Sequence, residues 1–110
     1  MFAALYFMLW LGLFETTSQP FDPCEVYGTI YVTNNEWEAD VRVYEEASEA
    51  FADVLVFEET NQLYADKRGK WYFTDSRDLA DVVIYWVDER RDGDLSVYFT
   101  NFESFAGCNR

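Results

Sequence analysis

The sequence contains no histidine. Histidine is the commonest general base and metal ligand near neutral pH, so its absence argues against Ser-His and Cys-His nucleophile pairs and most transition-metal sites. Basic residues are also scarce: eight Lys and Arg stand against twenty-one Asp and Glu, for a formal charge of −13. A surface of this sign repels phosphate backbones and anionic lipid headgroups. We therefore expect no enzyme, no nucleic acid partner and no peripheral binding to anionic membranes.

Cysteine is limited to two residues, Cys24 and Cys108, which bracket most of the chain. In an exported protein such a pair predicts one disulfide, which would close a loop of about 85 residues and stabilise the fold by about 4–5 kcal/mol. Two unrelated buried thiols are the alternative. Bonded cysteines have Cα atoms roughly 4.4–6.8 Å apart. A bridge therefore requires either that the intervening structure curls until its ends meet, or that a terminal segment runs back along it.

The longest apolar run extends from Met1 to Phe14. At about 1.5 Å per residue it reaches roughly 21 Å, short of the roughly 30 Å hydrocarbon core of a bilayer. We interpret residues 1–18 as a signal peptide and residues 19–27 as a lead-in that contains Cys24. A retained membrane anchor and an apolar element packed on the domain are the alternatives. The expected location is secreted, periplasmic or elsewhere in the cell envelope.

A thirteen-residue repeat fills residues 28–107, and a fixed period indicates one structural unit copied six times. The insertion Lys67-Arg68 breaks the register once. The units are GTIYVTNNEWEAD (28–40), VRVYEEASEAFAD (41–53), VLVFEETNQLYAD (54–66), GKWYFTDSRDLAD (69–81), VVIYWVDERRDGD (82–94) and LSVYFTNFESFAG (95–107).

Each unit begins with strand-forming residues and ends with turn-forming ones. A branched aliphatic residue at the third position precedes an aromatic residue at the fourth, which is typical of strands. The second half opens with a residue of the helix-capping type and ends with a large residue followed by Ala, which predicts a helical turn lying close on the sheet. The predicted caps are Asn34, Thr60, Asp75, Asp88 and Asn101, and the large residues are Trp37, Phe51, Tyr64, Leu79 and Phe105.

We therefore predict an α/β repeat fold of six short, parallel strands, each followed by a helical turn. The connections would be right-handed, and the array would close or nearly close into a small barrel-like ring. Parallel crossovers usually need a dozen or more residues, and roughly seven to nine are available here. The alternative is an all-β antiparallel up-and-down sheet or barrel.

The recurring motif Ala-Asp-Val-x-Val-Tyr, as in ADVRVY (39–44) and ADVVIY (80–85), is similar to an uncharacterised family of small bacterial Ala-Asp repeat proteins. The resemblance covers about residues 24–108. It implies a repeat fold and supplies no activity. The fifth unit departs from the motif with Gly93 in place of Ala, and the sixth ends in Gly107 in place of Asp.

The Asp at position thirteen of the first five units is the first candidate site. If the units share one orientation, these carboxylates line one rim, where they would bind a hard divalent cation such as Ca²⁺. Alternatively, each Asp accepts a backbone N–H at its own turn. The residues are Asp40, Asp53, Asp66, Asp81 and Asp94.

The aromatic row at the fourth position is the second candidate. It would form a sugar- or peptide-binding strip if exposed and part of the core if buried. Its members are Tyr31, Tyr44, Phe57, Tyr72, Tyr85 and Tyr98. The acidic pairs Glu45-Glu46 and Glu58-Glu59 occupy equivalent positions in successive units, so we expect them side by side on a solvated edge.

These patterns predict an acidic repeat domain that acts as a non-catalytic binding or structural module. Its partner would be a protein or an extracellular ligand. The alternative is a divalent-cation module that uses the Asp rim, and Ca²⁺ is the single cofactor that the sequence raises.

Overall fold

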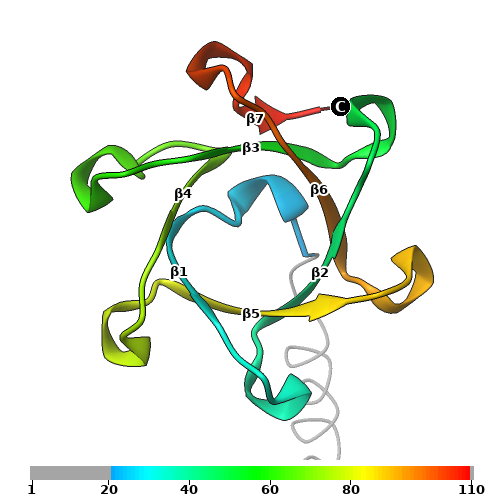
Figure 1. The fold of residues 1–110 in the computed structure, drawn as a ribbon. Helices are drawn as coiled ribbons and strands as arrows, with labels where there is room; N and C mark the ends of the chain where they lie inside the picture. Colours follow the sequence, from blue (N-terminus) through cyan, green and yellow to red (C-terminus); the bar gives the residue numbers. More distant parts are fainter. Residues whose placement is uncertain (1–20, 110) are drawn as a thin grey trace, which may run out of the picture.

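A computed structural model describes residues 21–109, which form a closed barrel of six parallel strands (Figure 1). The predicted signal peptide lies outside the described residues. The barrel strands are β1 (Gly28–Val32), β2 (Val41–Glu45), β3 (Val54–Glu58), β4 (Lys70–Phe73), β5 (Val82–Val87) and β6 (Leu95–Phe99), and a two-residue strand, β7 (Gly107–Cys108), follows them. The prediction of parallel strands in a ring is confirmed, and the antiparallel alternative is wrong for all six barrel strands.

The helical turns that link the strands are single three-residue 3₁₀ turns. They are η2 (Glu36–Glu38), η3 (Glu49–Phe51), η4 (Gln62–Tyr64), η5 (Arg77–Leu79), η6 (Arg90–Asp92) and η7 (Glu103–Phe105), and a further turn, η1 (Pro23–Glu25), precedes β1. Figure 1 shows η2 to η7 projecting outward around the ring. In the described part of the chain, no helix is long and apolar enough to cross a membrane.

Strands that follow one another in the sequence are mostly not neighbours in the sheet. The order is β4-β1-β5-β2-β6-β3, and pairing of β3 with β4 closes the ring. The chain therefore goes round the barrel twice: β4, β5 and β6 fill the gaps that β1, β2 and β3 leave. Only the step from β3 to β4 joins adjacent strands, and the insertion Lys67-Arg68 lies in that step. The repeat thus loses its register at the one connection between barrel strands that leads to the adjacent strand. Every other such connection passes over one intervening strand.

Neighbouring strands are staggered by two residues at every interface. Ile30, at the third position of its unit, pairs with Val82 at the first position, and the same offset recurs all round the ring. Six interfaces of two residues each give a total shear of twelve. A TIM barrel, with eight strands and a shear of eight, has half this stagger per strand. A larger stagger tilts the strands further from the barrel axis. Because the offset is the same at every interface, equal repeat positions lie at the same level along that axis.

The third repeat position forms the central layer of the core. All six side chains are completely buried: Ile30, Val43, Val56, Trp71, Ile84 and Val97. Trp71 donates its indole N–H to the carbonyl of Val26 at 2.9 Å, so the lead-in segment is bonded to this layer. In Figure 1 that segment lies within the outline of the ring. The fourth-position aromatic row faces outward and is half-buried, so it is neither core nor an open strip.

The turns differ from the prediction in the position of their caps. Their caps stand one residue later, for example at Asn35 and Asn61, whose side chains accept N–H bonds from Trp37 and Leu63. The large side chains of the turns face solvent: Trp37 is 93% exposed. The Ala at the twelfth position is buried or half-buried, which agrees with the prediction that a small residue lets the turn lie close on the sheet.

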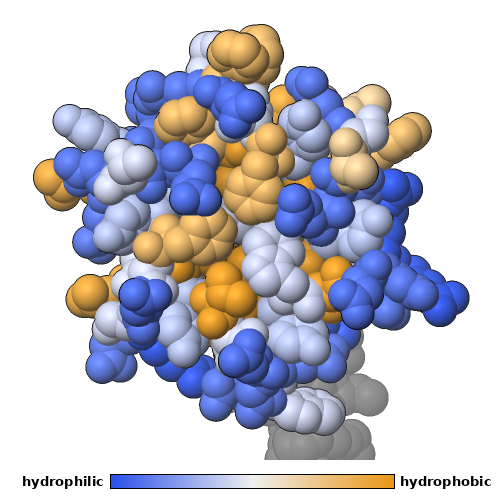
Figure 2. All heavy atoms as spheres, viewed as in Figure 1, coloured by the Kyte–Doolittle hydropathy of each residue, from blue (hydrophilic) through white to orange (hydrophobic). Residues whose placement is uncertain are grey.

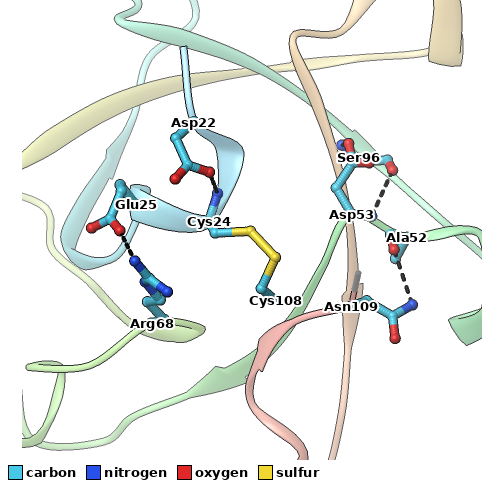
Figure 3. The surroundings of a disulfide bond; sticks show 9 residues. All are labelled: Asp22, Cys24, Glu25, Ala52, Asp53, Arg68, Ser96, Cys108 and Asn109. Atoms are coloured by element: carbon cyan, nitrogen blue, oxygen red, sulfur yellow. Dashed lines mark hydrogen bonds and ion pairs between the residues drawn. A yellow bond between two sulfur atoms is a disulfide. The ribbon is translucent and has the colours of Figure 1, made fainter. Parts of the chain in front are cut away.

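The disulfide Cys24–Cys108 is present, with Cα atoms 5.2 Å apart (Figure 3). It forms because a terminal segment runs back along the array, which is the second of the two predicted routes. Along β3, the last residues, Phe57 and Glu58, pair with β4, and the first residues, Val54 and Leu55, pair antiparallel with β7. We call this junction of β3, β4 and β7 the seam. Asn109 secures it by donating its side-chain amide to the carbonyl of Ala52 at 3.0 Å.

Candidate binding surface

The Asp residues at position thirteen lie at the end of the barrel where the strands begin, and four of them form hydrogen bonds to a neighbouring strand. The carboxylate of Asp40 accepts the N–H of Val83 at 2.9 Å, and its own N–H donates to the carbonyl of Val83 at 2.7 Å. We call this pair of hydrogen bonds a clamp. Each clamp extends the backbone hydrogen bonding between two neighbouring strands by one pair of bonds. Equivalent clamps join Asp53 to Ser96, Asp81 to Thr29, and Asp94 to Arg42.

Asp66 precedes the insertion, and its charge attracts the ammonium group of Lys70. Among the residues the structure describes, no three Cys, Asp or Glu side chains come together in a group that could hold a metal ion. Calcium binding by the Asp rim stays a prediction. Calorimetric titration with Ca²⁺ tests it, and heat of binding with a rise in Tm would support it.

The two acidic pairs are not side by side, because β6 lies between β2 and β3. The expectation of a shared solvated edge is therefore wrong. Within each pair the two carboxylates also separate: Glu45 and Glu58 are exposed, whereas Glu46 and Glu59 are buried. Alternation along a strand explains the difference, since successive side chains point to opposite faces.

The chain's own cation neutralises Glu46. Arg90, from η6, binds it with two N–H bonds, Nε to Oε1 at 2.5 Å and Nη2 to Oε2 at 2.8 Å. The Arg90 guanidinium also lies over the rings of Tyr44 and Phe51, at 6.0 and 5.6 Å from their centroids. The hydrogen bond to Glu46 raises the pKa of Arg90. This pair fixes η6 against β2.

Glu59 has a weaker arrangement of the same kind. Lys70 Nζ lies 3.6 Å from its Oε1, too far for a hydrogen bond, and 2.5 Å from Oε1 of Glu103. The Oε1 atom of Glu59 is buried without a hydrogen-bond partner in the described structure. The hydrogen bond to Glu103 raises the pKa of Lys70 against the opposing effect of burial. Both buried acids are thus paired with bases of the same chain, and Glu45 and Glu58 remain open to solvent.

The fifth repeat position forms what we call the barrel mouth, at the carboxyl ends of the strands. Its members are Val32, Glu45, Glu58, Phe73, Trp86 and Phe99. The side chain of Val32 is exposed, and the three aromatic residues are half-buried against the core.

The rings of the mouth also contact one another. Phe99 lies 6.4 Å from Phe73 and 6.0 Å from Trp86 between centroids. Figure 2, viewed along the barrel axis, shows hydrophobic side chains gathered at the centre of the face and mainly hydrophilic ones around them. The centre of the mouth is therefore an apolar surface within an otherwise acidic protein.

Two hollows extend the mouth over the outside of the barrel. The first, of about 400 Å³, is lined by Glu45, Tyr44 and residues 86–88. The second, of about 570 Å³, shares Trp86 and Asp88 with it and continues past Tyr85 to Arg42. Volumes of this size are typical of small-ligand sites, although both hollows are open and mainly polar. Trp86 therefore connects the mouth with the lateral surface.

Comparison with protein families gives a match to the 7(1) septoil knot domain over residues 23–109, which includes both cysteines and all seven strands. The chain belongs to the septoil knot domain family. No curated protein matches it. The interleaved strand order shows how a septoil knot protein can thread itself: β5 and β6 occupy gaps that the connections of the first circuit already span. The bacterial Ala-Asp description suggested by the motif stays a prediction.

The mouth of the septoil knot barrel is the feature that sequence reasoning missed. The sequence contains a signal for it, because the third position is a large apolar residue in all six units and the fifth must share its face of the strand. The Asp and aromatic rows repeat more regularly than this position does. The fifth position varies between apolar and acidic residues, as is expected where the side chain lies at the margin of the core and is not completely buried.

Proposed function

We propose that this septoil knot protein is an exported, non-catalytic binding module whose ligand docks at the barrel mouth. The single observation that carries the proposal is the apolar centre of the mouth, with Val32 36% exposed beside three half-buried aromatic rings. Exposed apolar patches framed by polar residues mark interaction surfaces more often than chance.

The rest of the charged surface supports a binding role over a catalytic one. Four Asp residues hold backbone N–H groups, and Glu46 and Glu59 form ion pairs with Arg90 and Lys70. A carboxylate engaged in this way holds the fold together and is poorly placed to transfer protons to a substrate.

Export is supported by the disulfide, because bonds of this kind persist in oxidising compartments. The interpretation of residues 1–18 as a signal peptide points the same way. The test is the intact mass of the protein from the envelope fraction of its host, with thiols alkylated before and after reduction. We expect loss of about eighteen residues, as for a cleaved signal peptide, with alkylation only after reduction. A full-length mass with freely alkylated thiols would overturn export.

Binding at the mouth is tested separately with a photo-crosslinking amino acid at Val32 and, as a control, at Asp78 on the exposed turn η5. Both variants are irradiated in the native envelope fraction. We expect position 32 to give one saturable adduct and position 78 to give none. Equal crosslinking from the two positions, or none from either, would refute the mouth as the binding surface.

A further inference from the structure

We propose that the barrel mouth binds a peptide segment in which an apolar side chain is flanked by Lys or Arg. This inference rests on the proposed function and narrows it to one class of ligand. The apolar anchor would contact Phe73, Phe99 and Val32 at the centre of the mouth, and the basic residues would reach the acidic side chains around it.

The charge around the mouth has one sign. Repeat positions five to eight, which follow the last buried core layer, contain acidic residues in four of the six units and no Lys or Arg in any unit. The acids are Glu45, Glu46, Glu58, Glu59, Asp75, Asp88 and Glu89. Glu46 and Glu59 are neutralised by Arg90 and Lys70, and Glu89 forms an ion pair with Arg91. Glu45, Glu58, Asp75 and Asp88 therefore leave a net negative border, which attracts a cationic partner.

The position of two of these acids next to aromatic side chains favours Arg and Lys in particular. Glu45, Trp86 and Asp88 line the same hollow beside Tyr44. A cation in that hollow would contact an aromatic face and a carboxylate together, and both contacts attract a guanidinium or ammonium group. The protein already combines these groups once, where Arg90 binds Glu46 and lies over Tyr44 and Phe51.

The same features disfavour other occupants of the mouth. A second copy docked mouth to mouth would bring Glu45 and Glu58 of both protomers together, and like charges in contact are destabilising. A phosphate group or an acidic peptide would meet the carboxylates of Glu45, Glu58, Asp75 and Asp88, whereas Arg91 is already paired with Glu89. A basic, apolar peptide is the ligand that complements both the hydrophobic centre and the charge.

The probe is a set of three dye-labelled synthetic tetrapeptides with blocked ends, measured by fluorescence anisotropy with the full-length disulfide-bonded protein. Arg-Leu-Phe-Arg carries both proposed features. Glu-Leu-Phe-Glu reverses the charge, and Arg-Ser-Gly-Arg removes the apolar anchor. We expect the first to bind at least about tenfold more tightly than either of the others, and its affinity to fall as salt rises from about 0.05 to 0.5 M because screening shortens the range of the attraction.

Paired variants place the binding at the mouth. The double variant Glu45→Lys, Glu58→Lys should weaken binding of Arg-Leu-Phe-Arg about tenfold, since two exposed attractions become repulsions. Its matched control, Glu49→Lys with Asp78→Lys, makes the same change of charge on the outlying turns η3 and η5 and should alter the affinity less than about twofold, because screening limits interaction at that range. All four acids are exposed, so both variants should keep the wild-type Tm.

Three results would overturn the inference. They are equal binding of the charge-reversed peptide, equal binding of the peptide without an anchor, and an equal loss of affinity in the control variant. Failure of this inference is distinguishable from failure of the proposed function. If no tetrapeptide binds while Val32 still gives a saturable crosslink, the mouth is a binding site for another class of ligand. If the crosslink is absent as well, both proposals are wrong.

Discussion

Substitution of Gly69 by Ala tests how tightly the seam closes the barrel. Gly69 has φ +82°, a left-handed conformation that costs most residues about 1–2 kcal/mol. An added Cβ would also lie 2.2 Å from the backbone N of Gly107 and 2.6 Å from the carbonyl O of Leu55. Ordinary contacts between such atoms are about 3.5–4 Å. The backbone segments at the seam would have to separate by about 1 Å or more.

Separation of the seam removes hydrogen bonds as well as contacts. The N–H of Phe57 donates to the carbonyl of Gly69 at 2.8 Å, and the N–H of Asn109 donates to the carbonyl of Asp53 at 2.9 Å. At about 1 kcal/mol for each lost bond, the steric effect adds about 2 kcal/mol to the conformational one. We expect Gly69→Ala to reduce the free energy of unfolding by about 3–4 kcal/mol, a large part of the 5–15 kcal/mol typical of a small domain.

Gly107→Ala is the matched control. Gly107 also has a positive φ, +141°, but an added Cβ would meet no atom within 4 Å. Its substitution should therefore show only the conformational cost, about 1–2 kcal/mol. Both variants are unfolded in guanidinium chloride with the disulfide intact and followed by tryptophan fluorescence, and the midpoints are compared at constant slope. If the two variants lose equal stability, the seam is not closely packed and the reasoning fails.

Three further predictions concern the bonds that hold the barrel together. Replacement of Cys24 and Cys108 by Ser should lower the free energy of unfolding by about 4–5 kcal/mol, because the bridge closes a sequence separation of 84 residues; a loss below about 1 kcal/mol in the same denaturation assay would refute this. Asp40→Ala should lower it by about 1–3 kcal/mol, since the variant leaves a strand N–H without its charged acceptor, whereas Asp78→Ala on a turn should have almost no effect. The stabilisation by Lys70, whose pKa is raised in the fold, is complete below its unfolded pKa of 10.5 and is lost as the pH rises through the folded value, so the difference in Tm between wild type and Lys70→Met should shrink in alkaline buffer; a constant difference would contradict the ion-pair explanation.

Much of the local structure follows directly from the repeat. Branched and aromatic residues at positions three and four specify a short strand, and a period with too few residues for a long crossover specifies a single helical turn. The cysteines determine their own partnership, because they are the sole pair in the chain. The hydrogen bonds of the Asp residues at position thirteen follow from chemistry as well: a short carboxylate beside a strand end bonds to backbone N–H groups, which is one of the two roles that the repeat predicts for them.

Only the tertiary structure decided which strands are neighbours. Identical units contain no local information that places β5 between β1 and β2, since every strand presents the same backbone edge to any other. That order separates Glu45-Glu46 from Glu58-Glu59, brings Arg90 and Lys70 to the two buried acids, and sets the fifth-position residues around one mouth. The thirteen-residue unit follows from the sequence because it depends on contacts between residues close in the chain. The disulfide follows because Cys24 and Cys108 are the only two cysteines. The interleaved order of the strands, and with it the apolar centre and acidic border of the mouth, depend on pairings between distant units, which repeated units do not encode locally.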